Sequence, residues 1–513
     1  MRKVPRSTGV AVLAFALGAA TVFGFAPFRF YPVPVLTLAA LALLWLRAAD
    51  WPAAAGLGLA FGLGLFLTGT SWVYVSLHDF GGMPAPVAAA CTFGFCAYLA
   101  LYPALVGALF RAAPVARNLK LVLLLPALWA LADWTRGWVF TGFPWLAIGY
   151  SQVPSSPLAG YAPLLGGYGV TLVTAAVAGA LALVFGRDRE RAARPLPARV
   201  RAVLGDGGLW LALALVLAGL TLGKLEWSQP LPGDPTPVAL AQGNIAQDLK
   251  WRPEKARETL ERYLRLARST DAPLVLLPET ALPMFNVDLP HGYLDALAAG
   301  VRARGGDMLL GIPEYAGPGR YYNSVISLGT SPSQTYRKVH LVPFGDYFPL
   351  RTLFGWFMNL LDIPMSDFSR GDAQQRPLEV AGQRVAINIC YEDVFGEEII
   401  RQLPEATVLA NFTNDAWWGR SWASRQHLQI AQMRSLETAR MMLRATNTGV
   451  TAIIDERGRV QAQAPEFEVA LLLGEVRGHT GATPFVHWGN YGLLVMAAGM
   501  LVVALGFRRG TQS

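Results

Sequence analysis

The stretch Val385-Ala-Ile-Asn-Ile-Cys-Tyr-Glu-Asp393 decides how the soluble half of this chain is interpreted, because an apolar strand pattern ends there on a cysteine. Two comparable strand ends lie upstream, at Leu276-Leu-Pro-Glu-Thr280 and at Tyr336-Arg-Lys-Val-His340. Each places one polar side chain at or just beyond an apolar run. Strand ends are where α/β folds build their sites. We therefore expect one site that contains Glu279, Lys338 and Cys390.

The pattern around these strands is that of a layered α/β domain, because short apolar strands alternate with helical periods from about Ser228 to Thr483. The Pro-rich stretch Gln229–Pro237 leads into it as a linker. The predicted strands are Val238–Ile245, Leu274–Pro278, Met308–Pro313, Ser324–Leu328, Val385–Cys390, Thr407–Phe412 and Val450–Ile454. The predicted helices are Glu254–Arg268, Tyr293–Arg304, Glu397–Leu403 and Trp422–Leu443.

Together the three polar residues are the minimum set for covalent acyl transfer. A free thiol with a pKa near 8.5 is only slightly ionised at neutral pH, so a carboxylate that accepts its proton assists attack on a carbonyl. Glu279 suits that role for Cys390. The tetrahedral intermediate then carries an oxyanion, which Lys338 and backbone N–H groups can stabilise. Taken singly, each residue has an ordinary structural explanation, since buried cysteines usually pack in cores and charged residues at strand ends are usually solvated.

The rest of the chain has the composition of a membrane protein. Of its 513 residues 53% are hydrophobic and only 15% are charged, against about 25% charged in average soluble proteins. Runs that approach the roughly 20 residues of a spanning helix are concentrated before Lys224 and after His487. We predict eight helices: Gly9–Ala26, Phe30–Leu46, Ala53–Leu77, Met83–Phe110, about Leu121–Thr135, about Ala162–Phe185, Gly207–Gly223 and Trp488–Phe507.

Basic residues fall in alternate loops and predict the orientation. They occur at the N-terminus, at Arg47, between Arg111 and Lys120, in the Arg187–Arg201 loop and at Arg508. These loops are expected in the cytoplasm, so the soluble domain is extracytoplasmic. The net charge of +8 is spread over such loops and follows no amphipathic face, which argues against nucleic-acid binding. The expected domains are 1–227 with helices one to seven, 228–483, and 484–513 with helix eight.

Some features leave alternatives open. The N-terminal apolar run is either a cleaved signal peptide or the first membrane helix, and the further spans favour a helix. The apolar loop Trp356–Met365 either packs on the core or dips toward lipid. Asp133 and Arg136 are expected at the membrane interface with snorkelling side chains, and a functional role for the pair is the alternative. The adjoining segment Phe140–Trp145 has the composition of an interfacial loop.

In these contexts and in this order, the three residues resemble the Glu-Lys-Cys triad of the nitrilase, or carbon–nitrogen hydrolase, superfamily. With eight predicted helices around it, the whole chain resembles that superfamily's apolipoprotein N-acyltransferase family. The resemblance is specific and covers nearly the whole chain. Further matching motifs are Gln242-Gly-Asn-Ile245, Trp251, Tyr322-Asn-Ser324, Val342-Pro-Phe-Gly345, Cys390-Tyr-Glu392 and Asn411-Phe-Thr-Asn-Asp-Ala-Trp-Trp418.

The resemblance implies a nitrilase-like αββα sandwich and a two-step reaction in a bacterial inner membrane. Cys390 would take the sn-1 acyl chain of a phospholipid, typically phosphatidylethanolamine, and hold it as a thioester. The α-amine of a lipoprotein's N-terminal diacylglyceryl-cysteine would then attack, on the periplasmic side. This implies membrane lipids and diacylated apolipoproteins as partners, with both chain termini in the cytoplasm. A monomer is expected, and with no metal-ligand cluster or phosphate loop in the sequence we predict no cofactor and no metal.

The resemblance also assigns supporting residues. Glu392 would support the site, and Asn323 belongs to a matching motif. Tyr391 and Trp251 would line or gate the site, with core packing as the alternative. The family expects a glutamate at position 346, so the shorter Asp346 raises the question of whether its carboxylate reaches the site.

Two other functions share parts of this pattern. A membrane-tethered amidase would use the same triad to hydrolyse a small amide, but such a substrate gives no reason for eight spans. A transporter or lipoprotein-binding scaffold with an inactive soluble domain would need no complete triad. The predicted helices also contain few of the charges that ion-coupled transport uses.

Overall fold

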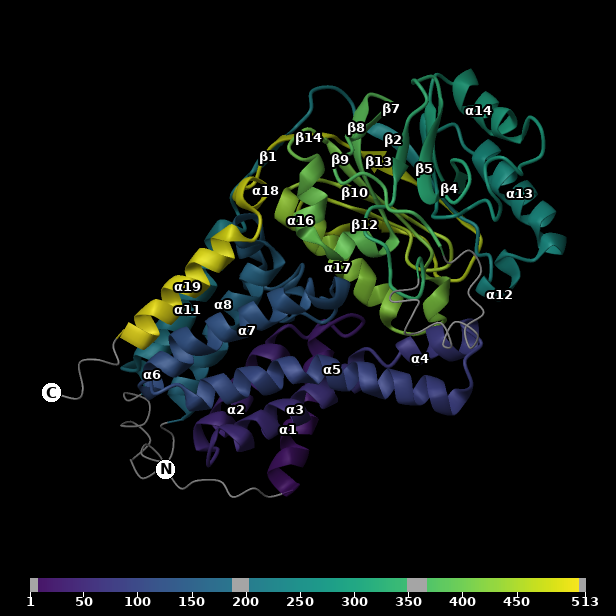
Figure 1. Cartoon of the computed structure of the whole chain (residues 1–513). Coiled ribbons are helices and arrows are strands. Elements are labelled where there is room, and N and C mark those ends of the chain that lie inside the picture. The colour runs from purple at the N-terminus through teal and green to yellow at the C-terminus, as the bar shows by residue number, and fades with distance from the viewer. Residues whose placement is uncertain (1–7, 187–202, 348–366, 507–513) are drawn as a thin grey trace. The chain divides into compact units, whose positions relative to one another are not determined.

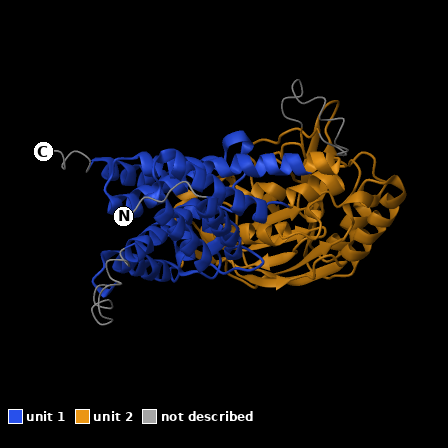
Figure 2. Cartoon of the chain, turned by 90° about the horizontal axis from the view of Figure 1, so that it is seen from below, with its two compact units in different colours: residues 1–71, 89–225, 488–513 blue, residues 72–88, 226–487 orange. Residues whose placement is uncertain are grey.

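The computed structural model describes residues 8–186, 203–347 and 367–506, and Figure 1 shows the arrangement of its elements. By their internal contacts these residues form two compact units, which Figure 2 colours separately. One unit, called here the helical unit, comprises residues up to Ser71, Ala89–Leu225 and residues from Trp488. The other, called the catalytic unit, comprises Trp72–Ala88 and Glu226–His487. Two features of the sequence analysis lie outside the described residues: the apolar loop Trp356–Met365 and the basic loop Arg187–Arg201.

The helical unit has one helix for each of the eight predicted apolar runs. Within the described residues three stretches, Trp51–Gly69, Ala85–Ala112 and Pro157–Phe185, are long and apolar enough by themselves to cross a bilayer. Shorter helical pieces join the main helices. The main helices are α1 (Thr8–Thr21), α2 (Pro32–Arg47), α3 (Trp51–Gly69), α5 (Ala85–Ala112), α7 (Leu125–Arg136), α8 (Ala162–Phe185), α11 (Gly207–Leu222) and α19 (Tyr491–Gly506).

Small residues let helices α1 and α3 approach closely. A Cβ atom on Gly18 of α1 would lie 1.9 Å from the backbone oxygen of Phe61, and one on Gly64 of α3 would lie 2.0 Å from that of Phe15. Apolar helices in lipid associate through such close backbone packing, because burial of apolar surface gives no driving force there. The glycine content of these runs therefore serves packing.

The prediction that Asp133 and Arg136 snorkel at the interface is wrong. Both side chains are buried, and Arg136 Nη2 lies 2.8 Å from Asp133 Oδ1. Arg136 Nη1 donates hydrogen bonds to the carbonyl oxygens of Phe143 and Trp145, at 2.6 and 2.7 Å. The irregular backbone after α7 leaves carbonyl groups without helical partners, and the arginine satisfies two of them.

The helix predicted over Ala53–Leu77 ends earlier, at Gly69. The residues that follow form the short pieces α4 (Val73–Val75) and η2 (Ser76–Phe80), which belong to the catalytic unit. Ser76 Oγ donates to the carbonyl oxygen of Trp417 at 2.9 Å, and the rings of Trp72 and Trp418 lie 5.3 Å apart. Hydropathy could not place this boundary, because apolar residues that pack on protein look like those that face lipid.

The catalytic unit contains two six-stranded sheets. In one, the order is β13-β2-β3-β4-β5-β6, with β2, β3 and β4 parallel; in the other it is β12-β11-β10-β9-β8-β7, with β8, β9 and β10 parallel. The strands of the first sheet are β2 (Thr236–Gln242), β3 (Leu274–Leu277), β4 (Asp307–Tyr315), β5 (Tyr321–Gly329), β6 (Thr335–Arg337) and β13 (Ala470–Val476). Those of the second are β7 (Leu378–Val380), β8 (Gln383–Ile389), β9 (Val408–Thr413), β10 (Met442–Thr446), β11 (Ala452–Ile454) and β12 (Val460–Gln463). A small separate pair joins β1 (Ser228–Pro230) to β14 (His479–Gly481).

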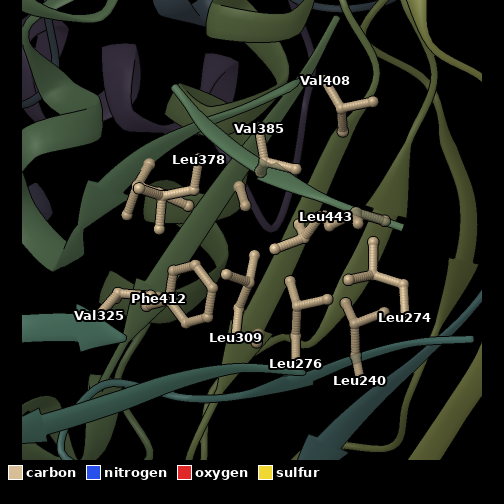
Figure 3. Packing of buried hydrophobic residues seen from close by; sticks show 14 of the residues in the cluster. Leu240, Leu274, Leu276, Leu309, Val325, Leu378, Val385, Val408, Phe412 and Leu443 are labelled. Atoms are coloured by element: carbon tan, nitrogen blue, oxygen red, sulfur yellow. The ribbon is translucent and has the colours of Figure 1, made fainter. Parts of the chain in front are cut away.

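The core lies between the two sheets, where Leu276 and Leu309 of the first sheet pack with Val385, Phe412 and Leu443 of the second, as Figure 3 shows. The outer face of the first sheet packs on α13 (Pro253–Arg268) and α14 (Tyr293–Ala303). The outer face of the second packs on α17 (Ala423–Thr438) and the short α16 (Gly396–Ile399). Because the central strands are covered on both faces, they read as continuous apolar runs. This is the expected αββα sandwich.

Two element predictions in this unit were wrong in extent. The helix predicted over Trp422–Leu443 ends at Thr438, because Ala439 adopts a left-handed conformation with φ 51°, and strand β10 follows. The helix predicted over Glu397–Leu403 is only α16 followed by a 3-10 turn. Strand β10 was not predicted, because the predicted helix Trp422–Leu443 extended into it. The other strands that were not predicted are short or partly exposed, and they are β1, β6, β7, β12, β13 and β14.

Candidate active site

Cys390 follows the last residue of β8 and begins a 3-10 turn, η7 (Cys390–Val394). Its φ of 53° is in the left-handed region, which costs a residue with a Cβ atom about 1–3 kcal/mol. Strained residues of this kind are held in place by their surroundings and gather at functional sites. Cys390 is partly buried, whereas the five strand residues before it, Val385–Ile389, are buried.

Glu279 lies two residues beyond the end of β3 and is 7% exposed. Its carboxylate has two hydrogen-bond donors of fixed position. Asn323 Nδ2 on β5 donates to Oε1 at 2.7 Å, and the backbone N–H of Asn414 donates to Oε2 at 2.9 Å. Lys338 Nζ lies 3.6 Å from Oε1. The carboxylate is therefore held by the sheets on both sides of the core.

Lys338 follows β6 and is 2% exposed. Its ammonium lies 2.8 Å from Asp346 Oδ2, so the aspartate reaches the lysine despite its shorter side chain. Burial alone would lower the pKa of Lys338, but the charges of Asp346 and Glu279 outweigh burial and raise it. The lysine thus remains a cation between two carboxylates.

The thiol of Cys390 is hard to ionise in this structure. Burial raises its pKa, the charge of Glu279 raises it further, and Lys338 opposes both effects. Attack by the sulfur therefore requires a base that removes the proton as the bond forms. Glu279 is the carboxylate whose charge acts most on the thiol, which suits it to that task.

Glu392 connects the backbone around the thiol to the backbone around the lysine. Its carboxylate accepts hydrogen bonds from the N–H groups of Ile389 at 2.7 Å, Val339 at 2.6 Å and His340 at 3.1 Å. The hydroxyl of Tyr336 is also within 3.2 Å. Burial raises the pKa of Glu392 to about 7, against the effect of these donors. One side chain thereby sets the spacing of two site segments.

The two aromatic residues that the resemblance assigned lie in different surroundings. Tyr391 is buried, with its ring 5.4 Å from that of Phe395 and 6.1 Å from that of His340. Trp251 is half-buried beside Lys250, whose Nζ lies 5.8 Å from the indole ring. The indole N–H of Trp251 has no hydrogen-bond partner among the described residues.

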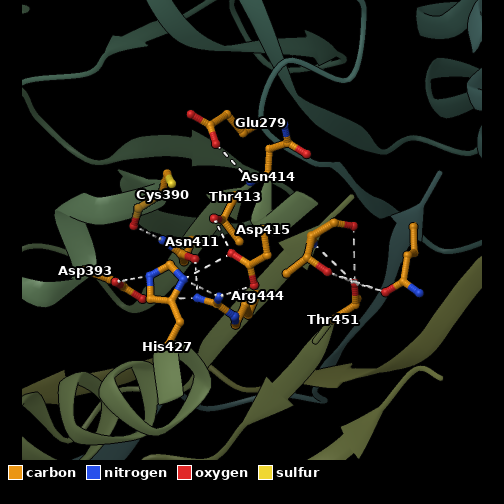
Figure 4. Close-up of polar contacts among 12 residues, drawn as sticks. Glu279, Cys390, Asp393, Asn411, Thr413, Asn414, Asp415, His427, Arg444 and Thr451 are labelled. Atoms are coloured by element: carbon orange, nitrogen blue, oxygen red, sulfur yellow. Dashed lines mark hydrogen bonds and ion pairs between the residues drawn. The ribbon is translucent and has the colours of Figure 1, made fainter. Parts of the chain in front are cut away.

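A fully buried charged cluster, not predicted from the sequence, lies next to the thiol segment (Figure 4). Arg444 on β10 contacts Asp393 Oδ2 and Asp415 Oδ2, each at 3.1 Å, and donates to Asn411 Oδ1 at 2.6 Å. His427 on α17 lies between the same aspartates, at 2.6 Å from Asp393 and 3.2 Å from Asp415. We call Asp393, Asp415, His427 and Arg444 the buried charge cluster.

This cluster touches the site at two points. Asn411 Nδ2, whose oxygen is held by Arg444, donates to the carbonyl oxygen of Cys390 at 3.1 Å. The hydroxyl of Thr413 donates to Asp415 at 3.0 Å and also lowers the pKa of Cys390. The run Asn411–Asp415 at a strand end was a sequence signal for this region. His427 and Arg444 had none, because their partners are distant in the chain.

The fold and this site define a class. The family described as "Carbon-nitrogen hydrolase" matches residues 237–485, which span the sandwich and the site. The family described as "Apolipoprotein N-acyltransferase N-terminal domain" matches residues 17–180 of the helical unit. The catalytic unit is therefore a carbon–nitrogen hydrolase domain, joined to a set of apolar membrane helices.

Relatives that match nearly the whole chain identify the family within the carbon–nitrogen hydrolase class. Proteins named apolipoprotein N-acyltransferase are 51% identical in Nitrosomonas europaea, where the match covers 96% of each chain, and 45% identical in Chromobacterium violaceum, where it covers 98% of this chain and 95% of the relative. A third, from Methylococcus capsulatus, is 43% identical over 98% of this chain and 97% of the relative. The chain belongs to the apolipoprotein N-acyltransferase family, and it is a membrane protein.

Proposed function

We propose that this protein transfers an acyl chain from a membrane phospholipid to the α-amine of a lipoprotein's N-terminal diacylglyceryl-cysteine. The observation that carries the proposal is the juxtaposition of Glu279, Lys338 and the strained Cys390 in a chain of this family. The roles that follow are assigned from that geometry.

In the first half-reaction Glu279 accepts the proton of the Cys390 thiol while the sulfur attacks the sn-1 ester carbonyl. The carbonyl oxygen becomes an oxyanion, which Lys338 stabilises. The carbon–oxygen ester bond then breaks, and Glu279 returns its proton to the departing alkoxide. The products are a lysophospholipid and an S-acyl thioester on Cys390.

In the second half-reaction the neutral α-amine of the lipoprotein attacks the thioester carbonyl. Glu279 accepts the amine proton, and Lys338 again faces the oxyanion. The carbon–sulfur bond breaks as the sulfur takes the proton from Glu279. The free thiol and an N-acylated lipoprotein result, so atoms and charges balance over the cycle.

Supporting residues act on these groups. Asn323 and the Asn414 N–H direct the carboxylate of Glu279. Asp346 keeps Lys338 charged and in place. Glu392 fixes the spacing between the thiol and lysine segments. We assign Tyr391 to packing beneath the thiol segment and Trp251 to the edge of the site.

The topology is proposed from charge and apolar runs. Residues 1–227 and 484–513 supply the membrane helices, and 228–483 form the catalytic domain on the periplasmic side of a bacterial inner membrane. The segment Trp72–Ala88 is placed with the catalytic domain, because it belongs to the same compact unit. Both termini are then cytoplasmic. Phosphatidylethanolamine is the proposed donor, and the protein acts as a monomer without a cofactor.

Intact-mass analysis of the purified protein after incubation with phosphatidylethanolamine tests the chemistry. The expected result is one added acyl chain that hydroxylamine removes and that Cys390→Ala never acquires. Glu279→Gln should block the adduct for want of a base, whereas Glu261→Gln, at an exposed position on α13, should form it normally. A diacylated lipopeptide should then discharge the adduct and gain the acyl chain.

Failure of folded wild-type protein to gain a mass adduct would overturn the phospholipid donor. A Cys390→Ala protein that still acylates the lipopeptide would overturn the thioester. Release of free fatty acid without transfer to the lipopeptide would favour hydrolysis, which is the amidase alternative.

A further inference from the structure

A second buried lysine, Lys250, adjoins the catalytic base and has no role in the reaction described above. It is the last residue of the short helix α12 (Gln247–Lys250) and is 2% exposed. Burial lowers its pKa to about 8, although the charges of Glu279 and Cys390 act in the opposite direction. An ammonium group this deep is expensive to bury unless its hydrogen bonds are satisfied.

The ammonium group holds the backbone turn that carries Glu279. Lys250 Nζ donates to the carbonyl oxygen of Glu279 at 3.3 Å and contacts the hydroxyl oxygen of Thr280. Thr280 has a φ of 44°, which is a strained conformation for a β-branched residue. A turn of this kind persists only where its surroundings fix it. Lys250 supplies two of the contacts that do so.

The same short helix also reaches the carboxylate of Glu279 through a second route. Gln247 Oε1 accepts a hydrogen bond from Asn414 Nδ2 at 2.8 Å. The backbone N–H of that asparagine donates to Glu279 Oε2 at 2.9 Å. Helix α12 thus contacts the backbone of the base through Lys250 and its carboxylate through Gln247 and Asn414. Nothing in the local sequence pattern distinguishes Lys250 from a solvated lysine.

We propose that Lys250 is a positioning residue for Glu279, which fixes the Glu279–Thr280 turn and supplies a second positive charge facing the base and the thiol. This inference rests on the proposed function. The charged groups that face the base are then Lys250 and Lys338, with Asp346 behind Lys338 and the Cys390 thiol opposite. Two cations that face the thiol stabilise the negative charge of the sulfur as it loses its proton.

The test is the rate of thioester formation on Cys390, followed by intact mass over a range of pH. Lys250→Met keeps the length of the side chain and removes the charge. We expect the rate to fall about 10- to 100-fold, since small displacements of a reacting group cost this much. The rate of the wild type should fall as pH rises through about 8, where Lys250 loses its charge, and Lys250→Met should lack this fall. A purely structural role would lower the amount of folded protein without removing that fall.

Two further variants complete the experiment. Lys255→Met removes a half-exposed lysine of α13 whose one ion pair among the described residues is with Glu258, and it should match the wild type in rate and profile. Thr280→Val removes the hydroxyl that contacts Lys250 but keeps the charge, so it should slow the reaction and retain the fall in rate near pH 8. Thr280→Val also carries the test if Lys250→Met does not fold.

The outcomes separate this inference from the proposed function. If wild-type protein forms the thioester but Lys250→Met forms it at the same rate with the same profile, the role of Lys250 is refuted. If Lys250→Met does not fold and Thr280→Val behaves like wild type, the proposal that Lys250 fixes the Glu279–Thr280 turn is refuted. If wild-type protein forms no thioester, the proposed function fails first, whatever Lys250 does.

Discussion

Arg444→Met tests whether the buried charge cluster is held together by its one permanent cation. Arg444 contacts both aspartates of the cluster, Asn411 and the ring of His427. Burial opposes ionisation of Asp415, and the charge of Arg444 is the main effect that outweighs it and lowers the pKa of that carboxyl. Removal of the guanidinium leaves two carboxylates in a site with no solvent contact.

The expected cost follows from that geometry. Breaking a buried ion pair by removing one partner typically costs about 3–5 kcal/mol. For a unit of this size about 2–4 °C of melting temperature is lost per kcal/mol, which predicts a fall of about 6–20 °C. The measurement is thermal unfolding of the whole protein in detergent, followed by near-ultraviolet circular dichroism and by the rate of thioester formation.

A matched control is available on α17. Arg425 also pairs with a carboxylate, Glu466, at 2.8 Å, but half of its side chain is exposed. Exposed pairs contribute at most about 1 kcal/mol, so Arg425→Met should change the melting temperature by no more than about 4 °C. Adding Asp393→Asn and Asp415→Asn to Arg444→Met should recover part of the loss. Equal melting temperatures for Arg444→Met and Arg425→Met would refute the reasoning.

Three further predictions concern the base, its support and the core. Asn323→Ala removes a hydrogen-bond donor to the carboxylate of Glu279. Hydrogen bonds to charged groups contribute about 1.5–3 kcal/mol, so thioester formation should slow about 10- to 100-fold. An unchanged single-turnover rate would contradict this. Glu392→Gln should change the pH dependence of stability. The folded-state pKa of Glu392 is about 7 and its ordinary value is 4.5, so its stabilisation is full below pH 4.5 and is lost as pH rises to 7. The variant should therefore gain about 3 kcal/mol relative to the wild type between pH 4.5 and 8, and parallel stability curves would exclude this. Leu276→Ala, in the core between the sheets, should cost about 2–5 kcal/mol by thermal unfolding, whereas Leu473→Ala, at an exposed position on β13, should cost under about 0.5 kcal/mol.

The sequence predicted most of the fold because most of it depends on local patterns. The central strands β2, β3, β8 and β9 are covered on both faces, so each reads as a short apolar run, and the main helices of the helical unit read as long ones. The central strand β10 was missed, because the predicted helix Trp422–Leu443 extended into it. The strand-end positions of Glu279, Lys338 and Cys390 were visible for the same reason. Such patterns do not give distances between side chains. Only the structure shows that the carboxylate of Asp346 lies close enough to contact Lys338, at 2.8 Å from its ammonium group.

The features that were missed depend on partners far apart in the chain. His427 lies on a helix whose inner face is polar, so its periodicity carried no signal of a core-facing side. In the sequence Lys250 resembles any lysine at the end of a helix. Its role becomes visible only through its contacts with the Glu279–Thr280 turn, which is distant in the chain. Asp133 and Arg136 were judged by their position in an apolar run, whereas the carbonyl groups of the following loop determine where Arg136 points.

The segment Trp72–Ala88 makes the catalytic unit discontinuous in sequence. Ser76 is synthesised 341 residues before Trp417, the residue whose carbonyl it contacts. During translation this segment is made before Trp417 and Trp418, so it lacks these contacts while the remaining apolar helices before Glu226 are synthesised. The unit therefore reaches its full set of contacts only late in synthesis. A protein shortened to residues 226–487 would expose the ring of Trp418 where Trp72 now packs, and would begin folding with one piece of its structure missing.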